Sequence, residues 1–149
     1  MNARKRDITN STASLLLCLV LLAGCRWPAP TPDIEPGEVV NRFYRWYLGY
    51  PGNPLVERAY RTSPYLAPAF IDEIDETLSS MQAGGGDPIL LAQDVPNDFS
   101  VEAVEVSGDE ATALLHLHWG EGSPPVARQV DLAIIDGEWR ITDVRMVEP

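Results

Sequence analysis

The chain has 149 residues, of which 11 are Lys or Arg and 22 are Asp or Glu, so its formal net charge is −11 at pH 7. Nucleic-acid binding depends on cations that neutralise phosphates, and adhesion to anionic lipid heads depends on basic clusters. The charge balance therefore excludes both as main functions. A chain of this length has enough residues for one domain with its own hydrophobic core, even if an N-terminal segment of 24 residues is removed, as the next residues suggest.

The N-terminus has the pattern of an export signal. Arg4, Lys5 and Arg6 form a positive segment, and residues 15–23 form an apolar segment interrupted only by Cys18. A transmembrane helix needs about 20 apolar residues, so this run is too short to be a permanent anchor. We therefore expect residues 1–24 to be a signal peptide that is removed.

The end of the apolar segment resembles the lipobox of bacterial lipoproteins. Leu22, Ala23 and Gly24 place small residues before Cys25, whose thiol would be acylated after cleavage. The alternative is an ordinary secretory signal followed by a chance cysteine. The lipobox predicts an exported protein held at the cell membrane or outer membrane by lipid on Cys25.

Loss of the signal changes both the charge and the cysteine chemistry. The removed segment carries a net +2, so the mature chain would have a net charge of −13 and contain no lysine. Cys18 would leave with the signal and Cys25 would carry lipid, so no disulfide is expected. The fold must then be stabilised by its core.

Residues 25–36 contain four prolines and almost no apolar periodicity, which favours an extended tether. A helix is expected to begin near Pro36, which suits the first helical position, and to end at Gly49 and Pro51. Apolar side chains in this helix recur at helical spacing, at Val39, Val40, Phe43, Tyr44, Trp46, Tyr47 and Tyr50. The aromatic run also suits carbohydrate binding, but its helical spacing favours a core position.

A second helix is expected to start at the pair Ser63-Pro64, which resembles a cap and first position, and to run to about Met81. Its apolar stripe is Phe70, Ile74 and Leu78. Four acidic residues form the opposite face, which we expect to be solvated: Asp72, Glu73, Asp75 and Glu76. Residues 87–96 form an apolar loop punctuated by prolines, and part of it should be buried.

The remaining residues change from helical period to period 2. Four strands are predicted at residues 100–106, 111–119, 126–135 and 139–147, separated by turn signals of which Asp136-Gly137 is the strongest. This order implies an antiparallel meander. The predicted fold class is α+β, with N-terminal amphipathic helices packed on a curved antiparallel four-stranded sheet.

Three segments together resemble the DUF3828 family, whose members are largely uncharacterised bacterial envelope proteins and lipoproteins: residues 39–48, 87–94 and 137–141. The resemblance covers most of residues 37–147 and defines the domain as residues 37–149. The closing hairpin is also similar to that of NTF2-like domains, in which a curved sheet encloses a pocket. The acidic second helix departs from this pattern, so partner surfaces of relatives do not transfer directly.

Five residues are candidates for a pocket or a functional loop: Trp46, Gln93, Asp94, His116 and His118. The two histidines share one face of a strand, but a metal site would need carboxylates that no spacing selects, so we expect no metal and no cofactor. Asp94 with either histidine could serve acid/base chemistry. The favoured interpretation is that Gln93 and Asp94 satisfy buried backbone groups and fix the path of their loop.

These features predict a membrane-anchored lipoprotein with a non-enzymatic binding or accessory domain of the cell envelope, acting on a protein partner or a small ligand. No nucleophile motif or phosphate-binding loop occurs. One alternative is a small NTF2-like enzyme or ligand-binding pocket protein. Another is an immunity-like inhibitor of an envelope hydrolase, for which the acidity suits a basic partner.

Overall fold

The computed structural model describes residues 32–81 and 85–147. The predicted signal peptide, its cleavage residues Leu22, Ala23 and Gly24, and the lipidated Cys25 lie outside the described residues. Within them no helix is long and apolar enough to cross a membrane. The described elements are α1 (Pro36–Leu48), a 3-10 helix η1 (Ala59–Thr62), α2 (Pro68–Ser80), β1 (Asp98–Ser107), β2 (Glu110–His118), β3 (Val126–Ile135) and β4 (Glu138–Met146).

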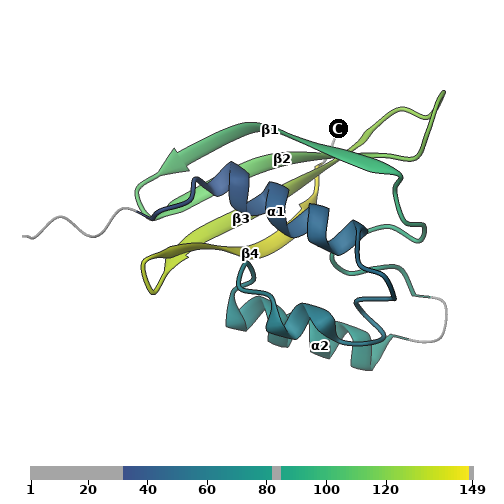
Figure 1. Ribbon diagram of the computed structural model, residues 1–149, viewed down its shortest axis with the longest axis horizontal. Coiled ribbons are helices and arrows are strands. Elements are labelled where there is room, and N and C mark those ends of the chain that lie inside the picture. The colour runs from purple at the N-terminus through teal and green to yellow at the C-terminus, as the bar shows by residue number, and fades with distance from the viewer. Residues whose placement is uncertain (1–31, 82–84, 148–149) are drawn as a thin grey trace, which may run out of the picture.

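The four strands form one antiparallel sheet in the order β1-β2-β3-β4, which confirms the predicted meander. Asp136 and Gly137 both have positive φ, 55° and 84°, as a two-residue hairpin turn requires. Helix α1 crosses one face of the sheet and contacts β1, β2 and β4, whereas α2 lies against β4 (Figure 1). The α+β class with helices on an antiparallel sheet is therefore confirmed.

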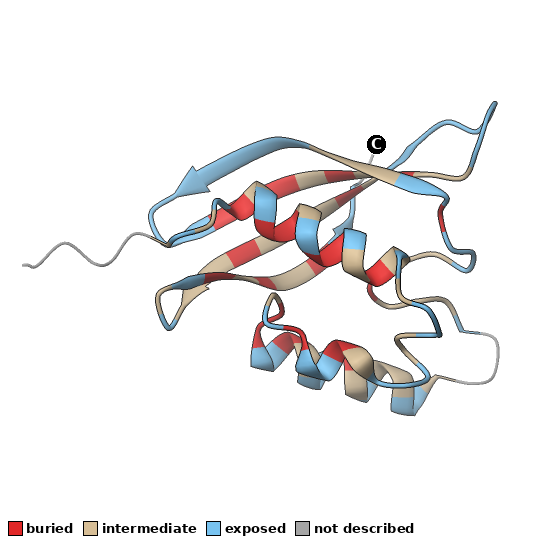
Figure 2. Ribbon diagram, viewed as in Figure 1, coloured by how far each residue is buried: buried red, intermediate tan, exposed pale blue. Residues whose placement is uncertain are grey.

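The core lies between α1 and the helix-facing side of the sheet. Buried residues alternate along β2 at Ala111, Ala113, Leu115 and Leu117, as period 2 predicts. Figure 2 shows buried residues along the side of α1 that faces the sheet. They are Val39, Val40, Phe43, Tyr44 and Tyr47, all within the predicted stripe. Burial of each large apolar side chain contributes about 1.5–3 kcal/mol.

The last residues of the predicted tether already belong to the domain. Ile34 packs against the core, and Pro36 is buried at the first position of α1. The predicted helix start at Pro36 is confirmed. The part of the proline-rich segment that can act as a free tether therefore ends before Ile34, because an apolar side chain this close to the helix gains stability by burial.

Helix α2 begins at Pro68, so the predicted start at Ser63-Pro64 is wrong. Leu66 instead forms an isolated bridge with Ile141 of β4: the Ala67 amide donates to the Ile141 carbonyl and the Ile141 amide donates to the Tyr65 carbonyl, both at 2.8 Å. This pairing with a distant strand outweighs the local helix-start signal. It also pairs the outer edge of β4 at Ile141.

Asp75 does not belong to a wholly solvated helix face, contrary to the prediction. The Tyr60 hydroxyl donates to its carboxylate, and Arg61 and Arg58 approach it at 2.7 and 3.6 Å. The hydrogen bond from Tyr60, with the nearby arginines, lowers the pKa of Asp75. Helix η1 and the residue before it, Arg58, thus place a tyrosine and two cations over α2. Asp72, Glu73 and Glu76 are exposed as expected.

Candidate functional site

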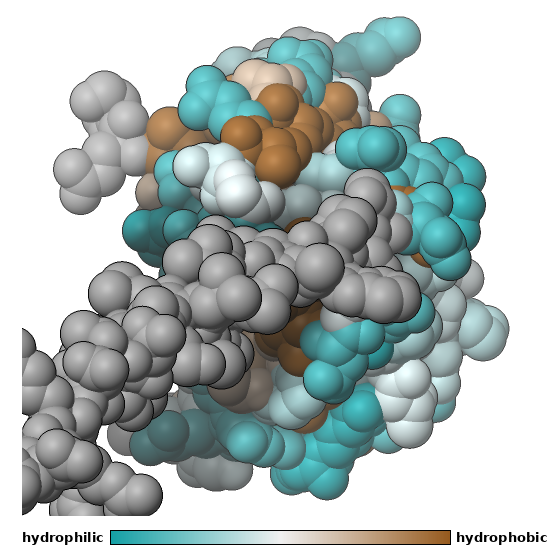
Figure 3. All heavy atoms as spheres, turned by 90° about the vertical axis from the view of Figure 1, so that its left-hand side faces the viewer, coloured by the Kyte–Doolittle hydropathy of each residue, from teal (hydrophilic) through white to brown (hydrophobic). Residues whose placement is uncertain are grey.

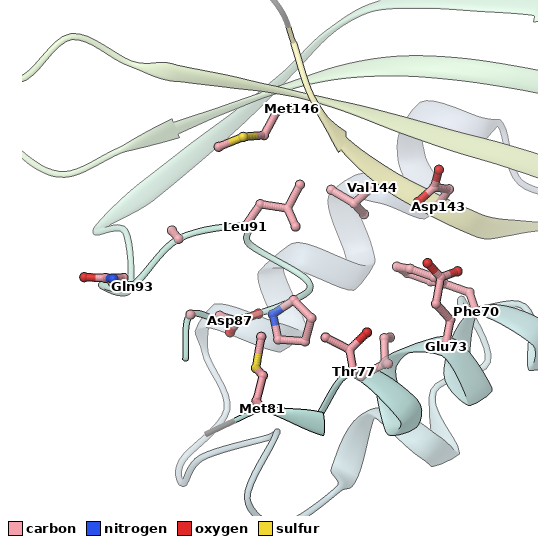
Figure 4. Close-up of a pocket in the computed structure, with 14 residues that line it drawn as sticks. Phe70, Glu73, Thr77, Met81, Asp87, Leu91, Gln93, Asp143, Val144 and Met146 are labelled. Atoms are coloured by element: carbon pink, nitrogen blue, oxygen red, sulfur yellow. The ribbon is translucent and has the colours of Figure 1, made fainter. Parts of the chain in front are cut away.

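A cavity of 560 Å³ lies between α2, the loop of residues 86–93 and the end of β4 (Figure 4). Its volume falls in the range of about 300–1,000 Å³ that is usual for ligand pockets. The apolar lining comes mainly from Phe70, Ile74, Leu91, Val144 and Met146. Carboxylates of Glu73, Asp87 and Asp143 and the amide of Gln93 supply the polar lining. The lining of the cavity therefore combines apolar side chains with three carboxylates.

Asp87 is the most constrained polar group of this cavity. Its carboxylate accepts hydrogen bonds from the Tyr47 hydroxyl at 2.7 Å, and from the amides of Ile89 and Leu90 at 2.7 and 2.9 Å. Burial raises the pKa of Asp87, although these hydrogen bonds oppose the rise. Burial and the adjacent carboxylate also raise the pKa of Tyr47. Asp87 therefore holds the loop by its amides and joins it to α1.

Arg128 binds the backbone carbonyls of the same loop. This β3 residue is only 4% exposed, and its guanidinium donates from Nε to the Leu90 carbonyl at 3.0 Å and from Nη2 to the Leu91 carbonyl at 2.7 Å. No ion pair to Arg128 is found within residues 32–81 and 85–147. Burial lowers the pKa of the guanidinium. A buried cation is tolerated here because its donors are used by carbonyl oxygens.

Sequence reasoning missed both Asp87 and Arg128. A signal for Arg128 exists, because it occupies a helix-facing position between Val126 and Val130 in a strand whose inward positions are otherwise apolar. Asp87 precedes Pro88 at the start of a turn, where an aspartate oxygen commonly accepts from amides two and three residues later. Together the two residues clamp the loop that forms one wall of the cavity.

The prediction that Gln93 and Asp94 satisfy buried backbone groups is wrong, because both residues are exposed. Gln93 lines the rim of the cavity, and the backbone carbonyl of Asp94 accepts from the Trp119 indole at 3.2 Å. The buried amides of this loop lie nearer its start, at Ile89 and Leu90. Asp87 is the carboxylate within reach of them.

His116 and His118 lie on the sheet face opposite the helices. Their neighbours Leu115 and Leu117 are buried on the helix-facing side, because successive strand residues point to opposite faces. The His118 Nε2 atom is 3.4 Å from the Ser100 hydroxyl, and the buried His116 Nε2 has no hydrogen-bond partner within the described residues. The sheet thus separates both histidines from the cavity and from Asp94.

Trp46 lies neither at the cavity nor on the sheet face that carries the histidines. It is partly buried on α1, packs edge-on against Tyr50 with ring centroids 5.7 Å apart, and lines a shallow hollow beside residues 62–65. The five predicted site residues are therefore not brought together into one site. Only Gln93 belongs to the cavity.

Replacing both histidines with glutamine should change the free energy of unfolding by no more than about 0.5 kcal/mol at neutral pH, because neither residue belongs to the core cluster and the buried Nε2 atom of His116 has no hydrogen bond among the described residues to lose. Zinc should not raise the melting temperature of the wild type. Within the described residues, no cluster of three His, Cys, Asp or Glu is placed to hold a metal ion. A zinc-dependent rise that the double variant lacks would contradict this prediction in thermal melts.

Asp87→Asn should change the pH dependence of stability. Because the pKa of Asp87 is raised in the fold, its protonated form contributes stability that is present below the ordinary value of 3.8 and is lost as pH rises through the folded pKa. Asparagine stays neutral at every pH. The free energy of unfolding of the variant should therefore rise relative to that of the wild type as the pH is raised from about 3.5 to 7. Urea denaturation at both pH values measures this difference, and one that does not vary with pH would contradict the prediction.

No family model matches this chain, and no curated protein matches it. Its fold is similar to a chain in the native and selenomethionine crystal structures of the type VI effector-immunity complex Tae3-Tai3 from Ralstonia pickettii. The native match has a TM-score of 0.60 at 20% identity and covers 76% of this chain and 96% of that chain. The selenomethionine match has a TM-score of 0.59 at 20% identity and covers 77% and 98%.

A protein of unknown function from Bacteroides thetaiotaomicron is also similar, with a TM-score of 0.50 at 20% identity, covering 72% of this chain and 85% of that one. At this level of identity the likeness is one of fold. The described domain thus has the fold of a chain that occurs in an effector-immunity complex.

Proposed function

We propose that this chain is a lipid-anchored, immunity-like protein of the bacterial envelope that binds and masks a basic envelope hydrolase. The observation that carries the proposal is the fold shared with nearly the whole of one chain in an effector-immunity complex. The partner is a protein and the role is non-enzymatic.

The charge of the chain supports a basic partner. The mature protein would carry 21 acidic residues against 8 arginines. Opposite charge on two proteins raises their association rate, to as much as about 10⁸–10⁹ M⁻¹s⁻¹ at low salt. Rapid capture suits an inhibitor that must neutralise a hydrolase before it damages the wall.

The arrangement of titratable groups supports a non-enzymatic role. Asp87, the buried carboxylate of the cavity, is occupied by a tyrosine hydroxyl and two backbone amides. His116 lies on the opposite face of the sheet. A general base must reach the proton it removes within hydrogen-bond distance, and a histidine there cannot assist the cavity carboxylate.

Inhibition of purified hydrolases tests the proposal. The detergent-solubilised lipoprotein is mixed at equimolar ratio with each of a panel of envelope hydrolases of pI above about 9, and solubilisation of purified cell walls is followed. One hydrolase should be fully inhibited, with an association rate that falls as salt rises. Acidic hydrolases serve as controls. Failure to inhibit any basic member would contradict the proposal.

The DUF3828 membership and an NTF2-like sheet remain part of this proposal as the finer classification of the fold. The cavity beside the sheet supports the NTF2-like part, because NTF2-like domains enclose a pocket. A DUF3828 protein should superpose on residues 37–147 with the same strand order. A different order of strands in such a structure would show that this chain does not share the DUF3828 fold.

Cys25→Ser should abolish acylation and release the protein from the membrane fraction. Stable attachment needs more than one acyl chain or a second signal, and the acidic domain supplies no basic patch. Palmitate labelling and fractionation measure the two effects. Cys18→Ser is the matched control, because that residue leaves with the signal. Unchanged labelling of the Cys25 variant would show that the lipobox resemblance is misleading.

A further inference from the structure

The two outer strands of the sheet differ in how their free edges are covered. The outer edge of β4 pairs with residues 65–67 through the Ala67 and Ile141 amides. Within the described residues, no backbone pairs with the outer edge of β1. Residues 102–107 of this strand are all exposed (Figure 2). An open edge of this kind presents unpaired amides and carbonyls to a partner.

The side chains of β1 form two chemically distinct rows beside this edge. A bulge at Ala103, with φ of 46°, lies between Glu102 and Glu105. Both glutamates belong to the row on the sheet face opposite the helices. Val104 and Val106 belong to the helix-facing row and are 40% and 55% exposed. Figure 3 shows hydrophobic atoms gathered at the top of the molecule, where Figure 1 places β1. The edge is therefore acidic on one side and apolar on the other.

The charge around this edge has one sign. Strands β1 and β2 and the turn between them carry five carboxylates and no Lys or Arg: Asp98, Glu102, Glu105, Asp109 and Glu110. Neither Glu102 nor Glu105 forms an ion pair with any described residue. A second copy of this chain would place glutamates opposite glutamates, and like charges across a strand pair are destabilising.

We infer that the outer edge of β1 binds an extended segment of a basic protein in which cationic and apolar side chains alternate, so that the segment adds a strand to the sheet. Its cations would lie beside Glu102 and Glu105 and its apolar side chains beside Val104 and Val106. Backbone hydrogen bonds supply affinity in such strand addition, and the alternating side chains supply specificity. The inference rests on the proposed function in that the segment belongs to the masked hydrolase.

A labelled peptide of about ten residues with alternating lysine and valine is the probe, since about that length matches one long strand. Its binding to the detergent-solubilised lipoprotein is measured by fluorescence anisotropy. The wild type should bind it, and Glu102→Lys with Glu105→Lys should weaken binding by at least about tenfold, a difference of about 1.4 kcal/mol. Asp72→Lys with Glu76→Lys is the matched control: it makes the same change in net charge on the exposed face of α2 and should bind like the wild type.

Hydrogen exchange locates the contact independently of the variants. Amides of residues 101–107 should gain protection on addition of the peptide. Four results would overturn the inference. The first is a wild type that does not bind the peptide, and the second is equal weakening of binding in both double variants. The third is protection outside residues 101–107, and the fourth is a wild type that forms dimers that the β1 variant does not form. The hydrolase panel reports separately on the proposed function, so peptide binding at β1 without hydrolase inhibition would leave the edge site standing alone. A β1 variant that melts well below the wild type is replaced by Glu105→Gln, for which the same loss of peptide affinity, smaller in size, is expected.

Discussion

Replacing Phe43 with alanine should lower the free energy of unfolding by about 3–5 kcal/mol, the usual cost of truncating a buried aromatic side chain. Phe43 is fully buried on α1. Its ring lies 5.1 Å from that of Tyr44 and 5.6 Å from that of Tyr47, centroid to centroid. Truncation would leave a cavity between α1 and the sheet and remove these aromatic contacts. Urea denaturation followed by tryptophan fluorescence measures the loss.

Arg45→Ala is the control on the same helix. Arg45 is exposed and donates to Asn41 one turn earlier, so its loss should change stability by no more than about 0.5 kcal/mol. Since whole domains are stable by only about 5–15 kcal/mol, the Phe43 variant would lose a large share of the total. Equal stability of the two variants would show that the ring is not a core residue.

Arg128→Met should lower the free energy of unfolding by about 3 kcal/mol, because one buried and one partly buried carbonyl lose a charged donor and each unsatisfied buried group costs about 1–3 kcal/mol. The carbonyls belong to Leu90 and Leu91. Methionine keeps the unbranched stem, so the loss reports on the hydrogen bonds. The loop of residues 87–92 should exchange its amide hydrogens faster in the variant.

Arg145→Met separates this effect from a general effect of removing a cation. Arg145 is exposed and pairs with Asp131 and Asp143. Exposed ion pairs contribute about 0–1 kcal/mol, so this variant should stay close to the wild type. If both variants lost the same stability, Arg128 would not be clamping the loop.

Patterns that involve neighbouring residues were enough to predict most of the fold. Period 2 placed Leu115 and Leu117 on the helix-facing side, because successive strand residues point to opposite faces. Asp136-Gly137 predicted a hairpin because its turn needs two residues with positive φ. The start of α1 at Pro36 followed from the missing amide of proline, which a first helical position does not need.

The cavity and its polar groups were not predictable in the same way. Asp94, not Asp87, was expected from the sequence to hold this loop. The Asp87-Pro88 turn is a local signal for hydrogen bonds to the next amides, but nothing local shows that the Tyr47 hydroxyl from α1 also reaches this carboxylate. The edge of β4 was likewise hidden in the sequence, since residues 65–67 meet Ile141 from more than 70 positions away.

The sequence by itself determined the elements, their order, the helix-facing residues and the strongly acidic charge, because each depends on spacing or composition along the chain. The tertiary structure alone decided which polar groups are used inside and that Arg128 and Asp87 clamp the cavity loop. It also decided that the outer edge of β4 is paired at Ile141, while no described residue pairs with the outer edge of β1. These outcomes depend on which distant backbone groups become buried together. A buried polar group without a hydrogen bond destabilises the fold, so buried backbone groups are found with a partner within reach.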